Sequence, residues 1–272
     1  MKGSVLHGST NYDGGIAVQF VHARLTARAL SAYPGEVPKD SQSAYACQDR
    51  AIDLWPDQVS GWKVARIPKE WAEKFPEPRI IGPVFSRNVH IAMQGALPSC
   101  PVFVGGFAAV ETEIVIRVGK DAPAHKTTWT ISEANDYIGS MHVGIEVASS
   151  PLATLNDLGT GAVISDFGNN WGVVVGPAIE NWRNVENIPC ECFIDGDSVG
   201  ARDVSIEQGP LSAFAFTLGK SAVRGRPLKA GAWITTGMIT GVHDIRVGQQ
   251  SRHVFKGFGE VGCRIVRAEP FE

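Results

Sequence analysis

The sequence predicts an α+β, or mixed α/β, fold in which an N-terminal helical layer packs on a larger mixed β-sheet. Two observations support this class. Apolar residues recur at helical spacing in the first third of the chain, and short β-rich runs separated by Gly, Pro and Asp follow from about residue 80. The 272 residues suit one large domain or two unequal ones. We expect an N-terminal helical region at 1–80 and a mixed β-sheet catalytic domain at 81–272, together forming one structural unit.

Two helices are predicted in the N-terminal region. The segment 16–34 has apolar side chains at roughly helical spacing and ends at a proline. Those side chains are Val18, Val21, Leu25 and Leu30. A second helix is expected to start at an N-cap formed by Asp40 or Ser41 and to end before Pro56.

Short apolar runs predict the strands. We expect strands at 59–67, 102–107, 110–118, 143–148, 161–165, 171–175, 191–194, 232–237 and 261–266. The sequence "IDGDS" at 194–198 predicts a hairpin turn, because Asp-Gly suits a positive φ. Two helices are expected between these strands, one capped by Thr130 or Ser132 and one that follows Pro210.

Composition limits the classes of partner. A net charge of −3 and an isoelectric point near 6.2 provide no basic field for nucleic acid, and no apolar run is long enough to span a bilayer. Small molecules or copies of the same chain are the expected partners. The first residues, "MKGSVLHGSTNYDGG", lack an apolar signal segment, so we expect a cytoplasmic protein with reduced thiols. Cys190 and Cys192 form a C-x-C pair without the second half of a zinc site.

The stretch "AAVETEIVIRV" at 108–118 contains two carboxylates inside an apolar run. In a strand, Glu111 and Glu113 share one face, because side chains alternate with period 2. Two adjacent negative charges repel, so this face is either wet or holds a cation. Taken alone, the pattern favours a solvated sheet surface with Arg117 as a nearby counter-charge.

A third acid favours the cation. Glu146 lies in the apolar strand "HVGIEVASSP", and three converging carboxylates suit Mg²⁺ or Mn²⁺, which prefer oxygen ligands. Such a site leaves positions for a chelating substrate. Lys63 lies in the apolar strand "VSGWKVARI", where it could bind a substrate carboxylate or exchange protons. The alternative is a lysine whose ammonium group reaches solvent.

The segment "GAVISDFGNNWGVVVGP" at 161–177 places Asp166, Asn169 and Asn170 between two apolar runs. These residues form either a tight polar turn or a polar loop that faces a binding pocket. The sequence contains no P-loop and no H-E-x-x-H. P-loop nucleotide binding and metalloprotease chemistry of the H-E-x-x-H type therefore have no motif to support them.

These segments, in this order, resemble a known family. They are "SAYACQ" (43–48), "VSGWKVA" (59–65), "RIIGPVF" (79–85), "VETEIVI" (110–116), "HVGIEVASS" (142–150), "VISDFGNNWGVVVGP" (163–177), "QGPLSAFAFTL" (208–218) and "LKAGAWITTGMITG" (228–241). The chain resembles the 2-keto-4-pentenoate hydratase group of the fumarylacetoacetate hydrolase superfamily. The resemblance covers roughly residues 40 to 266 and implies that superfamily's mixed β-sheet roll.

The resemblance also implies a site and a reaction. Residues matching the family's pattern would bind Mg²⁺ or Mn²⁺, namely Glu111, Glu113 and Glu146. Lys63 and Asp166 would take catalytic roles. Substrate-binding positions would be Lys63, Asn169, Asn170, Thr236 and Gly237. The implied reaction adds water to a 2-hydroxy-2,4-dienoate, equivalent to a 2-oxo-4-enoate, and gives a 4-hydroxy-2-oxo acid in aromatic-compound catabolism. A homo-oligomer is also implied.

Three stretches depart from the family pattern, at 79–81, 167–170 and 236–238. Hydratases of this group usually carry an aspartate in the first, D-N-x-S-S in the second and an S-G-S-like turn in the third. The metal ligands are intact, so the departures concern the reaction rather than the cation. A decarboxylase acting on a 2-oxo-dienedioate such as 4-oxalocrotonate is the first alternative. An acylpyruvate hydrolase is disfavoured because the chain has no H-x-x-E, and a non-catalytic metal-binding homologue is the remaining alternative.

Overall fold

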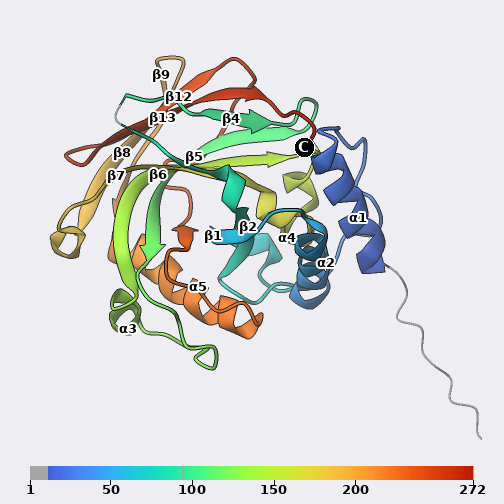
Figure 1. The fold of residues 1–272 in the computed structure, drawn as a ribbon, viewed down its shortest axis with the longest axis horizontal. Helices are drawn as coiled ribbons and strands as arrows, with labels where there is room; N and C mark the ends of the chain where they lie inside the picture. The colour runs from blue at the N-terminus through green and yellow to red at the C-terminus, as the bar shows by residue number, and fades with distance from the viewer. Residues whose placement is uncertain (1–11, 94, 272) are drawn as a thin grey trace, which may run out of the picture.

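Two β-sheets form the framework of the protein, in a computed structural model that describes residues 12–93 and 95–271 (Figure 1). In spatial order the larger sheet contains β2 (Arg79–Phe85), β1 (Val59–Arg66), β10 (Trp233–Thr235), β5 (Phe107–Val118), β6 (Ile138–Ser150), β7 (Asn170–Ala178) and β3 (Val89–Ile91), and β11 (Val242–Asp244) also pairs with β5. The smaller sheet contains β4 (Ser99–Val102), β13 (Gly259–Arg267), β12 (Gln250–Phe255), β8 (Asn187–Ile194) and β9 (Asp197–Ser205). This arrangement confirms the predicted mixed α/β class.

Five α-helices among the described residues flank the sheets. They are α1 (Tyr12–Leu25), α2 (Ser41–Leu54), α3 (Ile131–Asn135), α4 (Thr160–Ser165) and α5 (Ser212–Val223). Short helical turns join the longer elements: η1 (Lys69–Trp71), η2 (Ser86–Asn88), η3 (Asn156–Leu158), η4 (Phe167–Asn169), η5 (Trp182–Asn184) and the π-turn η6 (Glu207–Leu211). Helices α1 and α2 pack together on one side of the larger sheet, whereas α5 packs against β1 and β2 (Figure 1). No helix in the described part of the chain is long and apolar enough to cross a bilayer.

The longest strand pair, β5 and β6, lies at the centre of the larger sheet. It is antiparallel and aligns Glu111 with Glu146. One face of β5 presents Val110, Thr112 and Ile114, and Thr112 reaches His253 of β12 across the space between the sheets. The two sheets therefore share an apolar interior, and the opposite face of β5 carries the glutamates.

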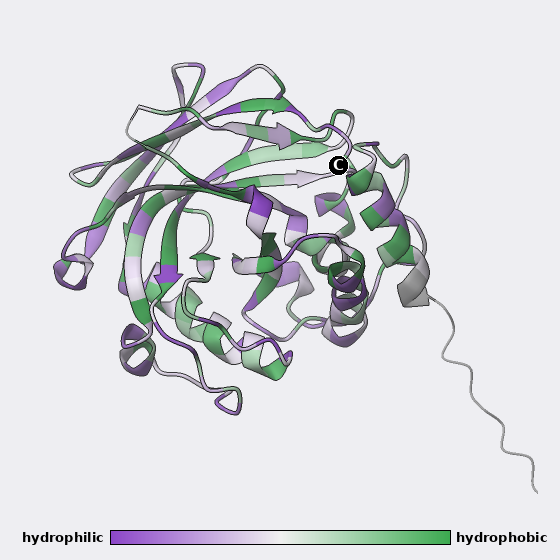
Figure 2. Ribbon diagram, viewed as in Figure 1, coloured by the Kyte–Doolittle hydropathy of each residue, from purple (hydrophilic) through white to green (hydrophobic). Residues whose placement is uncertain are grey.

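Hydropathy follows this layering. Almost all of β5 is buried, whereas most residues of β9 are exposed. In Figure 2 hydrophilic residues are correspondingly frequent on the outer strands β8 and β9. Charged side chains are unfavourable in a strand that is buried on both faces, so the buried glutamates of β5 require a specific partner.

Several predicted boundaries were wrong. The run 161–165 is helical rather than extended: the Val163 amide donates to the Gly159 carbonyl, and the Ser165 hydroxyl donates to the Gly161 carbonyl. The run 102–107 contains a turn between β4 and β5, closed by a hydrogen bond from the Gly106 amide to Phe103. The first helix ends at Leu25 rather than Pro34.

Other expectations were confirmed or incomplete. The central strands predicted at 110–118 and 143–148 are present and longer than predicted. Strands β2 and β12 were not predicted, since "RIIGPVF" carries a proline and "QSRHVF" begins with four polar residues. The five cysteines, which include the C-x-C pair on β8, are all free and buried.

Candidate metal centre

Three carboxylates meet on one face of the β5–β6 pair. Glu111 lies directly opposite Glu146 in the register, and Glu113 lies two residues further along β5 on the same face. One oxygen from each of the three carboxylates lies within 4.8 Å of the others, and all three side chains are buried. The alternation of the strands thus produces the cluster that the sequence predicted.

Hydrogen bonds orient two of these carboxylates. Glu146 Oε1 lies 3.1 Å from the ammonium nitrogen of Lys63 and accepts a 3.0 Å hydrogen bond from the amide of Asn170. Its second oxygen accepts from the Thr235 hydroxyl at 3.3 Å. Glu113 Oε2 accepts a 2.8 Å bond from the Gly237 backbone amide. The carboxylates are therefore held by β1, β7, β10 and the turn after β10.

The charges in this cluster do not balance, because three carboxylates face one ammonium group. Burial, with the neighbouring carboxylate of Glu146, raises the pKa of Glu111 to about 7 and raises that of Glu113 well above its ordinary value. Burial opposes the charge of Lys63, but the same carboxylates outweigh it and raise the lysine pKa. Glu113 Oε1 is buried without a hydrogen-bond partner. A divalent cation would satisfy this oxygen and neutralise the remaining charge, so the residues fit Mg²⁺ or Mn²⁺.

A cavity of about 560 Å³ opens on the cluster. Lys63 and Glu111 line it, while Glu113 and Glu146 lie behind its wall. Of the predicted substrate-binding residues, Asn169, Thr236 and Gly237 also line it. The cavity gives a small molecule access to the carboxylates and the lysine.

At 236–238, where the sequence departs from the family pattern, the hydrogen-bond donors of Thr236 and Gly237 already have partners within the protein. The Thr236 hydroxyl donates to the Ile114 carbonyl at 2.8 Å, and the Gly237 amide is bound to Glu113. Asn169 differs, because its amide nitrogen donates to Asn156 but its buried Oδ1 has no partner. Asn169 therefore lines the cavity and holds one unpaired buried acceptor, while direct substrate contacts from Asn169, Thr236 and Gly237 stay predictions.

Asp166 does not line this cavity. Its Oδ1 accepts a 2.6 Å bond from the guanidinium of Arg24, a buried side chain of α1. The same guanidinium donates to the carbonyls of Ser149 and Asn170 at 3.0 and 3.2 Å. Asp166 thus holds Arg24, and Arg24 positions the backbone of Asn170, whose side chain binds Glu146. Its catalytic role stays a prediction that the geometry does not support.

Two residues near the site were not assigned a role from the sequence. Thr235 binds Glu146, and Arg24 holds the loop behind it. A positively charged residue on the apolar face of a helix was the available signal for Arg24. Thr235 lies within the stretch 228–241 that resembles the family, directly before the departing residues 236–238, and its position on β10 gave no separate signal.

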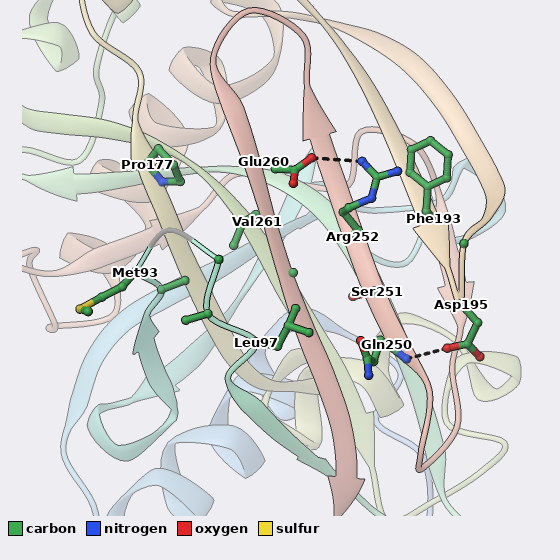
Figure 3. A pocket seen from close by; sticks show the side chains of 15 residues that line it. Met93, Leu97, Pro177, Phe193, Asp195, Gln250, Ser251, Arg252, Glu260 and Val261 are labelled. Atoms are coloured by element: carbon green, nitrogen blue, oxygen red, sulfur yellow. Dashed lines mark hydrogen bonds and ion pairs between the residues drawn. The ribbon is translucent and has the colours of Figure 1, made fainter.

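A second cavity of about 560 Å³ lies away from the carboxylates (Figure 3). Strands β12 and β13 and residues 92, 93 and 95–97 border it, and Figure 3 shows Arg252 paired with Glu260 on its rim. Asp195 accepts a bond from the Gln250 amide at the other end. None of the predicted site residues lines this second cavity.

No protein-family model matches the chain, and no curated protein sequence matches it. Solved structures do. The chain is similar to 4-oxalocrotonate decarboxylase from Pseudomonas putida G7 complexed with magnesium and adipate, with a TM-score of 0.74 and 16% identity over 92% of this chain and 96% of that one. The calcium and acetate complex of that enzyme gives the same TM-score at 17% identity, with the same coverage.

A second similar structure is the fumarylpyruvate hydrolase from Pseudomonas aeruginosa in complex with Mn²⁺ and pyruvate. Its TM-score is 0.56 at 19% identity, over 78% of this chain and 91% of that one. These structures are members of the fumarylacetoacetate hydrolase superfamily, and the similarity shows that this chain has their fold. At these identities the similarity is evidence of fold and leaves the reaction to the residues of the site.

Proposed function

We propose that this chain is a divalent-metal-dependent hydratase that adds water to a 2-hydroxy-2,4-dienoate and forms a 4-hydroxy-2-oxo acid. The observation that carries the proposal is the buried cluster of Glu111, Glu113 and Glu146 beside Lys63, with Glu111 and Lys63 lining a cavity. When bound by these carboxylates, Mg²⁺ or Mn²⁺ supplies Lewis-acid polarisation of the 2-oxygen and a template for a chelating substrate. The same donor set is what the family resemblance implies.

The side chains of this protein supply the proton transfers. Loss of the 2-hydroxyl proton and protonation of C5 convert the dienoate into a 2-oxo-3-enoate. Water oxygen then bonds to C4, and a proton is delivered to C3, which completes the addition. Lys63 is the group placed to donate protons to carbon, because its raised pKa keeps it an ammonium and it lines the cavity 3.1 Å from Glu146. The free Oδ1 of Asn169 can accept a hydrogen bond from the substrate or from the attacking water.

A decarboxylase is the second candidate. Loss of CO₂ from a 2-oxo-dienedioate passes electrons to the same 2-oxygen, so the cluster suits either reaction. Arginine side chains in the cavity wall favour a substrate with a second carboxylate, and a 4-oxalocrotonate decarboxylase is among the similar structures. Hydration and decarboxylation differ in whether carbon is lost, which makes them easy to separate.

Purified protein with Mg²⁺ or Mn²⁺ should be offered 2-hydroxypenta-2,4-dienoate and 4-oxalocrotonate, with absorbance and released CO₂ both recorded. We expect loss of the dienoate chromophore without CO₂. Lys63→Met should lower the rate by about 10²–10⁴-fold, while Lys69→Met, at an exposed position of η1, should not. Release of CO₂ from 4-oxalocrotonate, together with no reaction of the dienoate, would refute the hydratase proposal in favour of a decarboxylase. Inertness towards both substrates would refute both candidates.

A further inference from the structure

The turn η4, directly before β7, contains three consecutive residues with left-handed backbone. Phe167, Gly168 and Asn169 have φ values of 54°, 69° and 62°. Glycine and asparagine tolerate this conformation, but a bulky residue such as phenylalanine rarely adopts it. A strained backbone of this kind persists only where the surrounding structure enforces it, and it is most frequent at functional sites. The turn therefore requires a structural explanation.

The ring of Phe167 anchors η4 in this conformation. It is buried, and it lies edge-on to the rings of Trp55 and Phe85, with centroid distances of 5.7 and 5.0 Å. The guanidinium carbon of Arg24 lies 5.1 Å from the centre of the same ring. Of the three residues of η4, Asn169 alone lines the cavity over the carboxylates. The phenylalanine thus acts from behind the cavity wall.

The backbone of η4 lies against β2 beside the lysine. A Cβ built on Gly82 would lie 2.2 Å from the carbonyl oxygen of Phe167, and one built on Gly168 would lie 3.1 Å from Gly82 Cα. Glycine at both positions permits this close approach. Gly82 is opposite Lys63 in the β1–β2 register, and the same Cβ position on Gly168 lies 3.5 Å from Lys63 Cδ. The turn therefore covers the aliphatic part of the lysine side chain, which is 4% exposed.

Two groups held by η4 meet at one carboxylate oxygen. The ammonium nitrogen of Lys63 lies 3.1 Å from Glu146 Oε1, and the side-chain amide of Asn170 donates to the same oxygen at 3.0 Å. Asn170 directly follows η4, and its backbone amide donates to the Phe167 carbonyl. A change in the path of the turn would therefore move both groups relative to Glu146.

We propose that Phe167 is a positioning residue: its anchored ring holds η4 in the left-handed conformation, and η4 fixes Lys63 and Asn170 on Glu146. Phe167 lies in the stretch 167–170 that departs from the family pattern, and it contributes the position of other groups rather than a contact with substrate. The catalytic consequence rests on the proposed function, which uses Lys63 as a proton donor. The positioning itself involves neither metal nor substrate.

Access to the Lys63 amine tests this role in the metal-free protein without turnover. The folded chain would be treated with trinitrobenzenesulfonate, and mass spectrometry would compare the modification rate of Lys63 with that of Lys69, which is exposed on η1. In wild-type protein we expect Lys63 to react at least about 100-fold more slowly, because the reagent reaches it only when the structure opens locally. Phe167→Leu should raise the Lys63 rate at least about tenfold, because the turn then opens more often.

Phe255→Leu is the matched control for the loss of a buried ring, because Phe255 lies on β12 in the smaller sheet. It should leave Lys63 protected. Rapid modification of Lys63 in wild-type protein, or an unchanged rate in Phe167→Leu, would overturn the positioning role. An equal rise in Phe255→Leu at the same unfolding temperature would also overturn it, because the effect would then be general loosening.

A second pair of variants perturbs the backbone and keeps the Phe167 ring. Gly168→Ala places a methyl group against β2 and should also raise the Lys63 rate. Gly196→Ala adds the same strain at a φ of 96°, where no atom lies within 4 Å, and should leave Lys63 protected. Equal rates in these two variants would contradict the role of η4. These rates with a protein inactive towards both substrates would support the positioning role and refute the proposed function.

Discussion

Replacement of Arg24 by methionine should destabilise the protein strongly, because Arg24 is buried and binds Asp166 at 2.6 Å. Its guanidinium also donates to the carbonyls of Ser149 and Asn170, and it lies 5.1 Å from the ring centre of Phe167. The substitution leaves a buried carboxylate without its counter-charge, and loss of one partner of such a pair costs about 3–5 kcal/mol. Urea unfolding of the metal-free protein, monitored by fluorescence, would measure this change in the free energy of unfolding.

Two further variants separate the ion pair from general damage. Adding Asp166→Asn to Arg24→Met removes the uncompensated charge and should recover about 1–3 kcal/mol. Arg252→Met breaks an exposed pair with Glu260 and should cost less than about 1 kcal/mol. A loss below about 1 kcal/mol for Arg24→Met, or no recovery in the double variant, would refute the reasoning.

Two other predictions concern the residues behind β5 and β6. Asn170→Ala removes the amide that orients Glu146, and Mn²⁺ affinity measured by titration should fall about 10–100-fold. The control Asn184→Ala, in the turn η5, should leave the affinity unchanged. An equal fall in both variants would contradict the role of Asn170. His253 is fully buried against Thr112 and its pKa is lowered to about 3, so the unfolded chain takes up a proton near its ordinary pKa while the native chain does not. The free energy of unfolding should therefore fall by about 2 kcal/mol more in wild-type protein than in His253→Gln between about pH 6.5 and pH 5, as measured by urea unfolding. Parallel pH dependences in the two proteins would rule out this contribution.

The position of the three clustered glutamates was predictable, because it follows largely from local rules. Period-2 alternation puts Glu111 and Glu113 on one face of any strand, and an apolar context marks Glu146 as a strand residue. Local rules do not predict that β5 pairs with β6. The resemblance to the family, through the order of its segments, supplied the expectation that the three carboxylates come together. Lys63 was predictable only in part, because a lysine inside an apolar strand either has a buried partner or reaches solvent, and the local pattern left both open.

The residues around the ligands were less predictable, because tertiary contacts determine them. On α1 the sequence pattern favoured a face with Val18, yet Val18 is 49% exposed and Phe20 and Arg24 are buried instead. Asp166 was read as a cavity residue from its neighbours in sequence, whereas its partner Arg24 lies 142 positions earlier in the chain. No local pattern encodes such a contact, and this also explains why the helix at 161–165 was taken for a strand.

Mn²⁺ titration of the metal-free protein is the most direct test of whether the three buried glutamates hold a divalent cation. We expect one Mn²⁺ per chain in wild-type protein and in Glu70→Gln, a cavity residue outside the cluster. Glu113→Gln should weaken binding strongly and, because it removes charge repulsion, should not lower the unfolding temperature of the metal-free protein. Absence of Mn²⁺ binding in wild-type protein, or equal affinity in Glu113→Gln, would contradict the account.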